Sequence, residues 1–186
     1  MGNRNKSDVL IELKDDFSRE AINSHNRYRM NHNCPPLKHA DDLTELAHKI
    51  AYYMSNRNKD LKQRLTKDRI ENTLGENVSV KILTKGDDYT GEEVTDDWYN
   101  EIEQYSKYFN KEPPSELKNP DVKHFKNFTQ LIWKDTKEVG FGKIKSNNRV
   151  IVVACYRPAG NIPGQYTHNV LPPMMTENTG CCCSCC

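Results

Sequence analysis

The stretch VGFGKIKSNNRVIVVACY, residues 139–156, decides the class of fold. Its two ends are apolar and rich in β-branched or aromatic residues, and the polar KSNN between them is typical of a turn. Two such runs joined by a short turn predict a β-hairpin at the end of the folded body. Cys155 falls in the apolar second run, so we expect an inert thiol with a raised pKa.

Helices are expected before this hairpin. In residues 17–31, Phe17, Ala21, His25 and Tyr28 recur on nearly one helical face, with Asp15 or Asp16 as the N-cap. Pro35 and Pro36 must interrupt that helix. Residues 41–55 have the clearest amphipathic pattern in the chain, and Asp42 with Glu45 resembles a capping box.

The middle of the chain alternates between polar loops and short elements. Residues 56–73 are strongly charged and predict a loop, and a short strand is expected over residues 77–82. Thr90 and Glu93 form a capping pair ahead of a third helix within residues 92–109, and residues 124–136 predict a short buried helix. The inward stripe of the third helix is expected to be Val94, Trp98, Ile102 and Tyr105.

The 186 residues suit one domain, which we place at residues 15–173, with tails at 1–14 and 174–186. No run approaches the roughly 20 apolar residues that cross a bilayer, and the N-terminal stretch lacks the pattern of a secretory signal, so a cytosolic location is expected. The net charge of +1 offers no broad field for phosphates. We therefore expect no nucleic-acid partner.

Six segments occur in this order along the chain: HNRYR (25–29), PPLKHADDL (35–43), LGENVSV (74–80), WYNEIEQY (98–105), NFTQLIWKDT (127–136) and VVACYRPAGNI (152–162). Together they resemble the CAP superfamily, which is named for cysteine-rich secretory proteins, antigen 5 and pathogenesis-related proteins. Gly2 and the NVLPP ending at 169–173 are similar to its intracellular, Golgi-associated branch. The resemblance implies an α+β fold, a three-layer α-β-α sandwich with a small antiparallel sheet between helices, and it suggests a homodimer.

Family members commonly carry two histidines and two glutamates in a cleft suited to a divalent ion. The resemblance places the glutamates at Glu76 and Glu101, but Asn127 stands where one histidine is expected and the other has no counterpart. His124, about one helical turn before Asn127, is the nearest substitute. We therefore expect a remnant of the cleft, with no catalytic residue and no cofactor beyond a weakly held divalent cation.

The two ends of the chain carry candidate lipidation sites. Gly2 is a candidate for N-myristoylation, although Lys6 stands where the motif prefers Ser or Thr. At the other end, a run of cysteines provides candidate sites for palmitoylation. Two alternatives remain for this tail: its thiolates bind a metal, or it is unmodified and reactive. The tail cysteines are Cys181, Cys182, Cys183, Cys185 and Cys186.

These patterns favour a non-enzymatic CAP-domain protein that is lipid-anchored to the cytosolic face of Golgi or plasma membranes and binds protein partners or lipid. One alternative is a soluble carrier of sterol or fatty acid. The other is a metal-dependent hydrolase that uses Glu76, Glu101 and His124.

Overall fold

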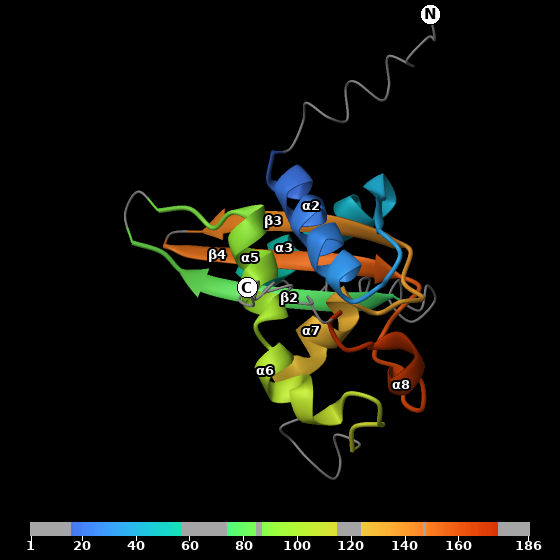
Figure 1. Ribbon diagram of the computed structural model, residues 1–186. Helices are drawn as coiled ribbons and strands as arrows, with labels where there is room; N and C mark the ends of the chain where they lie inside the picture. Colours follow the sequence, from blue (N-terminus) through green and yellow to red (C-terminus); the bar gives the residue numbers. More distant parts are fainter. Residues whose placement is uncertain (1–15, 57–73, 85–86, 115–123, 147, 175–186) are drawn as a thin grey trace, which may run out of the picture.

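The computed structural model describes residues 16–56, 74–84, 87–114, 124–146 and 148–174 (Figure 1). A four-stranded sheet in the order β1-β3-β4-β2 lies between two layers of helices, which confirms the predicted three-layer α-β-α sandwich. The predicted N-terminal tail, residues 1–14, and all of the predicted C-terminal tail except Met174 lie outside the described residues. So do residues 57–73 of the predicted charged loop.

The predicted hairpin forms the centre of the sheet. β3 (Glu138–Ser146) pairs antiparallel with β4 (Arg149–Arg157), and β2 (Gly75–Ile82) pairs antiparallel with the other side of β4. The sheet is mixed, however, because β1 (Lys38–His39) runs parallel to β3. The backbone bonds from Lys38 N to Lys137 O and from Ala40 N to Val139 O hold this short connection against the edge of β3.

Helix α3 (Asp41–Asn56) covers one face of the sheet. Its apolar stripe packs on Ile151, Val153 and Cys155 of β4. The helix approaches β3 closely where that strand has glycines: a Cβ on Gly142 would lie 2.3 Å from the carbonyl carbon of Ala47. The two glycines of the GFG sequence, residues 140–142, therefore allow the close contact between α3 and β3.

The opposite face carries α2 (Asp16–Asn31), α5 (Gly91–Tyr99) and α7 (Lys126–Leu131). Figure 1 shows α2 and α5 on the side of the sheet away from α3. The short helices α6 (Ile102–Tyr105) and α8 (Tyr166–Asn169) and the 3-10 turn η1 (Ser106–Tyr108) extend this layer. Its core is aromatic: Trp98, which was predicted to point inward, is buried together with Phe128, Trp133 and Tyr156.

Two local predictions need correction. The predicted third helix does not run unbroken, because Asn100 and Glu101 separate α5 from α6. Asp42 is not an N-cap, because α3 already begins at Asp41, and the Asp42 carboxylate instead accepts a hydrogen bond of 2.7 Å from Arg157. The capping box of Thr90 and Glu93 at the start of α5 is confirmed.

Candidate functional site

The break between α5 and α6 places Glu101 beside the start of α7. Its carboxylate accepts hydrogen bonds from the backbone N–H of Asn127 (2.9 Å) and of Phe128 (3.1 Å). The side-chain amide of Asn127 donates a third, at 2.6 Å. The first turn of a helix has backbone N–H groups without partners in the helix. Glu101, which lies outside α7, accepts hydrogen bonds from two of these groups and so caps the helix.

Burial raises the pKa of the Glu101 carboxyl above its usual value, and the hydrogen bonds from Asn127 and Phe128 together with the nearby His124 offset only part of this effect. Both carboxylate oxygens already accept N–H bonds from α7. A metal ion that took these oxygens would compete with the cap that holds α7 in place.

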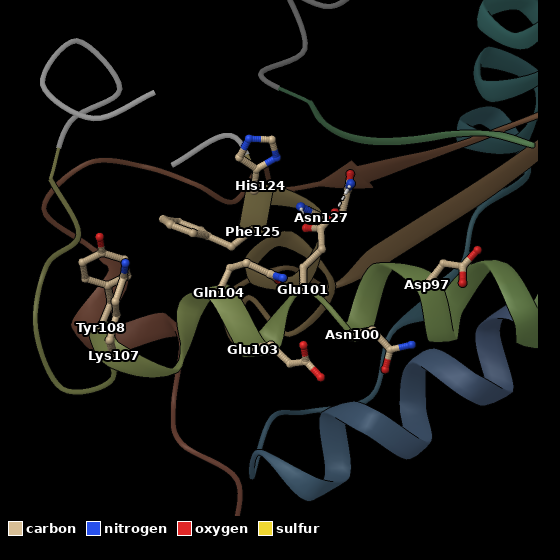
Figure 2. Close-up of a pocket in the computed structure, with 10 residues that line it drawn as sticks. All are labelled: Asp97, Asn100, Glu101, Glu103, Gln104, Lys107, Tyr108, His124, Phe125 and Asn127. Atoms are coloured by element: carbon tan, nitrogen blue, oxygen red, sulfur yellow. Dashed lines mark hydrogen bonds between the residues drawn. The ribbon is translucent and has the colours of Figure 1, made fainter. Parts of the chain in front are cut away.

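Glu101 lies at the wall of an open pocket of about 1030 Å³ (Figure 2). The side chains around it come from α5, α6, η1 and the start of α7, and most of them are polar. They include three acidic side chains and one lysine. The lining residues are Asp97, Asn100, Glu101, Glu103, Gln104, Lys107, Tyr108, His124, Phe125 and Asn127.

The structure brings together three of the four predicted cleft residues. Glu101, Asn127 and His124 share the pocket, and Figure 2 shows His124 on the same side of it as Asn127. Glu76 is placed differently. It pairs with Cys155 across β2 and β4, and Cys155 packs beneath α3, so strand alternation assigns Glu76 to the α3 face of the sheet.

These positions do not fit the donor set of a family-type metal centre. Glu76 is assigned to the opposite face of the sheet, Glu101 is occupied by amide donors, and Asn127 provides an amide in place of an imidazole. Within the described part of the chain, no three His, Cys, Asp or Glu side chains are grouped so that they could hold a metal ion. No chemical step through a metal follows from this arrangement.

The HNRYR segment, residues 25–29, turns out to stabilise the fold. His25 is fully buried, and its ring nitrogens lie 2.7 Å from Ala21 O and 2.9 Å from the Tyr156 hydroxyl. Burial lowers the pKa of His25 to about 3, which keeps the ring neutral. Asn26 both donates to and accepts from the backbone of Leu37, which fixes the turn after α2.

Arg29 is buried and donates to backbone carbonyls from two loops. Its guanidinium reaches Pro35 O (2.8 Å), Leu131 O (3.0 Å), Trp133 O (2.8 Å) and Thr136 O (3.0 Å). Burial lowers the pKa of Arg29 to about 10, so the group stays charged at neutral pH. Five N–H donors on a planar fork make Arg suited to this role. This role of Arg29 could not be predicted, because nothing in a single sequence shows which carbonyls a side chain will meet.

The cysteines of the body are both buried. Cys155 lies in β4, the apolar run in which the sequence places it, and packs beneath α3, whereas Cys34 is buried next to Pro35 and Pro36. The Cys34 thiol donates to Ile132 O at 3.1 Å, and burial raises its pKa. Neither thiol is presented as a nucleophile.

Several pocket residues were missed by the sequence analysis although a signal was present. Asp97, Gln104 and Tyr108 recur at helical spacing with the predicted Glu101, on the side of the segment next to the Trp98 stripe. That pattern predicts a shared polar face. It does not distinguish a pocket from an ordinary solvated surface.

The model of the cysteine-rich secretory protein (CAP) family matches residues 22–156, and the chain belongs to this family. It is 34% identical over 160 residues to the human Golgi-associated plant pathogenesis-related protein 1, covering 84% of this chain and 94% of that protein. The yeast (Saccharomyces cerevisiae) protein PRY2 is 29% identical over 160 residues, which cover 84% of this chain but only 42% of PRY2.

Solved structures support the same fold. The NaASP2 structure with Zn2+ has a TM-score of 0.62 at 18% identity, with 87% of each chain covered. BmVAL-1 has a TM-score of 0.57 at 20% identity, with 82% of this chain and 81% of that chain covered. At this level of identity the likeness extends to the fold alone.

Proposed function

We propose that this chain is a peripheral membrane protein whose CAP domain is held by acyl chains at the cytosolic face of Golgi or plasma membranes, where it binds protein or lipid and catalyses no reaction. The observation that carries the non-catalytic part is the position of Glu101, whose carboxylate is bound by three N–H donors at α7. A carboxylate used in this way is a poor ligand and a poor general base.

The anchoring part of the proposal rests on the chain ends. Gly2 and the five terminal cysteines provide two lipidation signals, and stable anchoring takes two signals because a single myristoyl chain binds only marginally. Within the described residues, no helix has the length and apolar character to span a bilayer. The human relative is named as Golgi-associated, which supports an intracellular membrane as the location.

The alternative of a soluble lipid carrier has less support. The pocket beside Glu101 is lined mainly by amides, carboxylates and a lysine, which do not suit a sterol or acyl chain. A carrier would yield extractable lipid from the purified protein. The alternative of a metal-dependent hydrolase would yield stoichiometric metal that is lost when Glu76, Glu101 and His124 are replaced.

Membrane fractionation of the full-length chain from eukaryotic cells tests the anchor. We expect the parent chain to pellet with membranes and a variant with all five terminal cysteines changed to Ser to shift to the soluble fraction. Ser184→Ala, which alters the tail without removing a thiol, is the matched control and should pellet. Gly2→Ala separates the contribution of the N-terminus.

A parent chain that stays soluble, or a five-Ser variant that pellets as the parent does, would refute anchoring through the tail. Because Cys34 and Cys155 are buried, thioester labelling of the folded chain reports on the tail cysteines.

A further inference from the structure

The outer edge of β3 is open over much of its length. β1 covers only the start of this edge, where it pairs with Glu138 and Val139. The N–H of Phe141 comes next and donates to the Thr44 side chain at 3.3 Å. Beyond it, over residues 142–146, no partner strand is found within the part of the chain that the structure describes. An open strand edge is a template for pairing with another strand.

The register of the sheet shows which backbone groups point out of this edge. The carbonyl of Val139 accepts a hydrogen bond from Ala40, next to β1, and the N–H of Phe141 points the same way. Since backbone direction alternates along a strand, Lys143 and Lys145 also turn their N–H and C=O groups outward. Among the described residues, no backbone partner is found for these outward groups.

Apolar side chains flank the open edge on the α3 face of the sheet. α3 meets this side of β3 through Thr44 and His48. Tyr52 follows one turn further along the same row of the helix and is 54% exposed. Ile144, whose side chain belongs to the same face, is only partly buried. A strand with an apolar face, added at the edge, would cover both Tyr52 and Ile144.

The side chains of β3 on the opposite face of the edge are lysines. The Lys143 ammonium pairs with the Asp88 carboxylate at 2.7 Å. The Lys145 ammonium donates to the backbone carbonyl of Asp87 at 3.1 Å, and no carboxylate partner is found for it in the described ranges. An acidic side chain on a neighbouring strand would therefore be favourable beside Lys145.

The chain ahead of α2 contains a stretch that suits this edge. Residues 9–13, VLIEL, are rich in residues that favour strands, and they alternate between two faces. One face carries Leu10 and Glu12. The other is wholly apolar and consists of Val9, Ile11 and Leu13. This pattern matches an edge with apolar neighbours on one face of the sheet and lysines on the other.

The position of α2 determines how this stretch can reach the edge. The Lys143 ammonium lies 4.9 Å from the centroid of the Phe17 ring. Further along α2, the ring centroids of His25 and Phe141 are 5.1 Å apart. The helix therefore begins over the later part of β3 and runs antiparallel to it (Figure 1). A strand parallel to β3 would end where α2 begins, and residues 14–15 provide the two-residue loop that is typical between a strand and a helix.

We infer that residues 9–13 join the open edge as a fifth strand, parallel to β3, and close this edge to other strands. The register that suits both the short loop and the charges places Ile11 opposite Ile144 and Glu12 opposite Lys145. The Lys145 N–H then donates to Ile11 O, in the hydrogen-bond pattern of the parallel β1–β3 pair.

The added strand changes where the N-terminal end of the chain leaves the domain. Since the strand is parallel to β3, the chain ahead of Val9 lies toward β1. The C-terminal segment leaves at the same end of the sheet, because the Met174 N–H donates to Asn31 O, 2.7 Å away, at the end of α2. Without the strand, the 16 residues of α2, about 24 Å, would separate the two exits. The strand thus brings Gly2 and the terminal cysteines to one end of the domain.

Amide hydrogen exchange of the full-length, unacylated chain, followed residue by residue by NMR, tests the inference. The Lys145 N–H should be protected in the parent chain. Ile11→Glu places a charge on the apolar face of the added strand and should accelerate exchange of the Lys145 amide by about tenfold or more. Leu10→Glu makes the same chemical change one residue earlier, on the face of the lysines. It is the matched control and should retain the protection.

A Lys145 amide that exchanges in the parent at the rate of an unstructured chain would overturn the inference. Equal exchange of this amide in the two variants, whether fast or slow, would overturn it as well. The amide of Val153, in the central strand β4, should stay protected in all three chains, which establishes that the domain is folded. Since no acylation occurs in this assay, failure of the added strand and failure of the proposed anchor are distinguishable.

Discussion

The carboxylate of Glu101 connects two segments that are 26 residues apart in the sequence. The family resemblance identified Glu101 as a cleft residue, and the structure adds that it caps α7 together with the Asn127 side chain. This second role could not be predicted, because the break in the helix at Asn100–Glu101 is set by tertiary contacts. The apolar period continues through Ile102 and Tyr105 as if the helix were unbroken.

Glu101→Ala should lower the free energy of unfolding by about 2–3 kcal/mol, since it removes charged acceptors from N–H groups that are partly shielded from water. Urea denaturation monitored by far-ultraviolet circular dichroism measures this change. Glu103→Ala is the matched control: the side chain is exposed in the same segment, and its loss should change stability by less than about 0.5 kcal/mol. Similar values for the two variants would contradict the capping role.

His25 predicts a pH dependence of stability. Its pKa is lowered to about 3 in the fold, whereas the unfolded chain has the ordinary value of 6.5. The unfolded state therefore binds the proton first as the pH falls, so the contribution of His25 is complete above pH 6.5 and is lost as the pH decreases toward about 3. The slope is at most about 1.4 kcal/mol per pH unit in that window.

The measurement is the unfolding free energy at a series of pH values for the parent and His25→Gln. The variant keeps an amide near Ala21 O and the Tyr156 hydroxyl but cannot titrate, so it should have a lower plateau and a shallower slope below pH 6.5. An unchanged slope in His25→Gln would contradict the buried neutral ring.

Among the elements, those with strong local signals were predicted well. The helices at residues 16–31 and 41–56, the Thr90 cap and the hairpin from 138 to 157 all have their signals within a few residues of sequence. The two-residue strand β1 was not predicted. Its pairing depends on the hydrogen bonds between Asn26 and Leu37, which hold the preceding turn, and on the position of β3, rather than on the residues of β1 itself. No local sequence pattern predicts the parallel pairing of so short a segment.

The contact between α3 and β3 predicts that Gly142→Ala is more harmful than an ordinary glycine substitution. A new Cβ would meet backbone atoms of Ala47 and His48 at 2.3 Å, so α3 would have to move away from the sheet. We expect a loss of about 2 kcal/mol or more. The comparison is Gly164→Ala, where nothing lies within 4 Å of the new Cβ but φ is +81°, and where about 1 kcal/mol is expected. Thermal unfolding that ranks Gly164→Ala as the more harmful change would contradict the close packing.

For the whole molecule, the α-β-α sandwich could be predicted because six short segments that resemble the family occur in the family's order. The apolar residues within these segments also recur with the periods of helices and strands. The placement of the cleft residues was not. Glu76 and Glu101 belong to opposite sides of the sheet by register and by capping, which no spacing in the sequence reveals. The proposed membrane anchor therefore rests on the two ends of the chain, whereas the proposed lack of catalysis rests on the capping role of Glu101 in the folded domain.

The most direct test of the proposed membrane anchoring by acyl chains is the intact mass of the full-length chain, purified in detergent from eukaryotic cells and measured before and after treatment with hydroxylamine. The account predicts a mass above that of the bare polypeptide that falls by a whole number of fatty acyl groups on treatment, and no such decrease in the variant with all five terminal cysteines changed to Ser. A chain whose mass before treatment is already that of the unacylated polypeptide would contradict it.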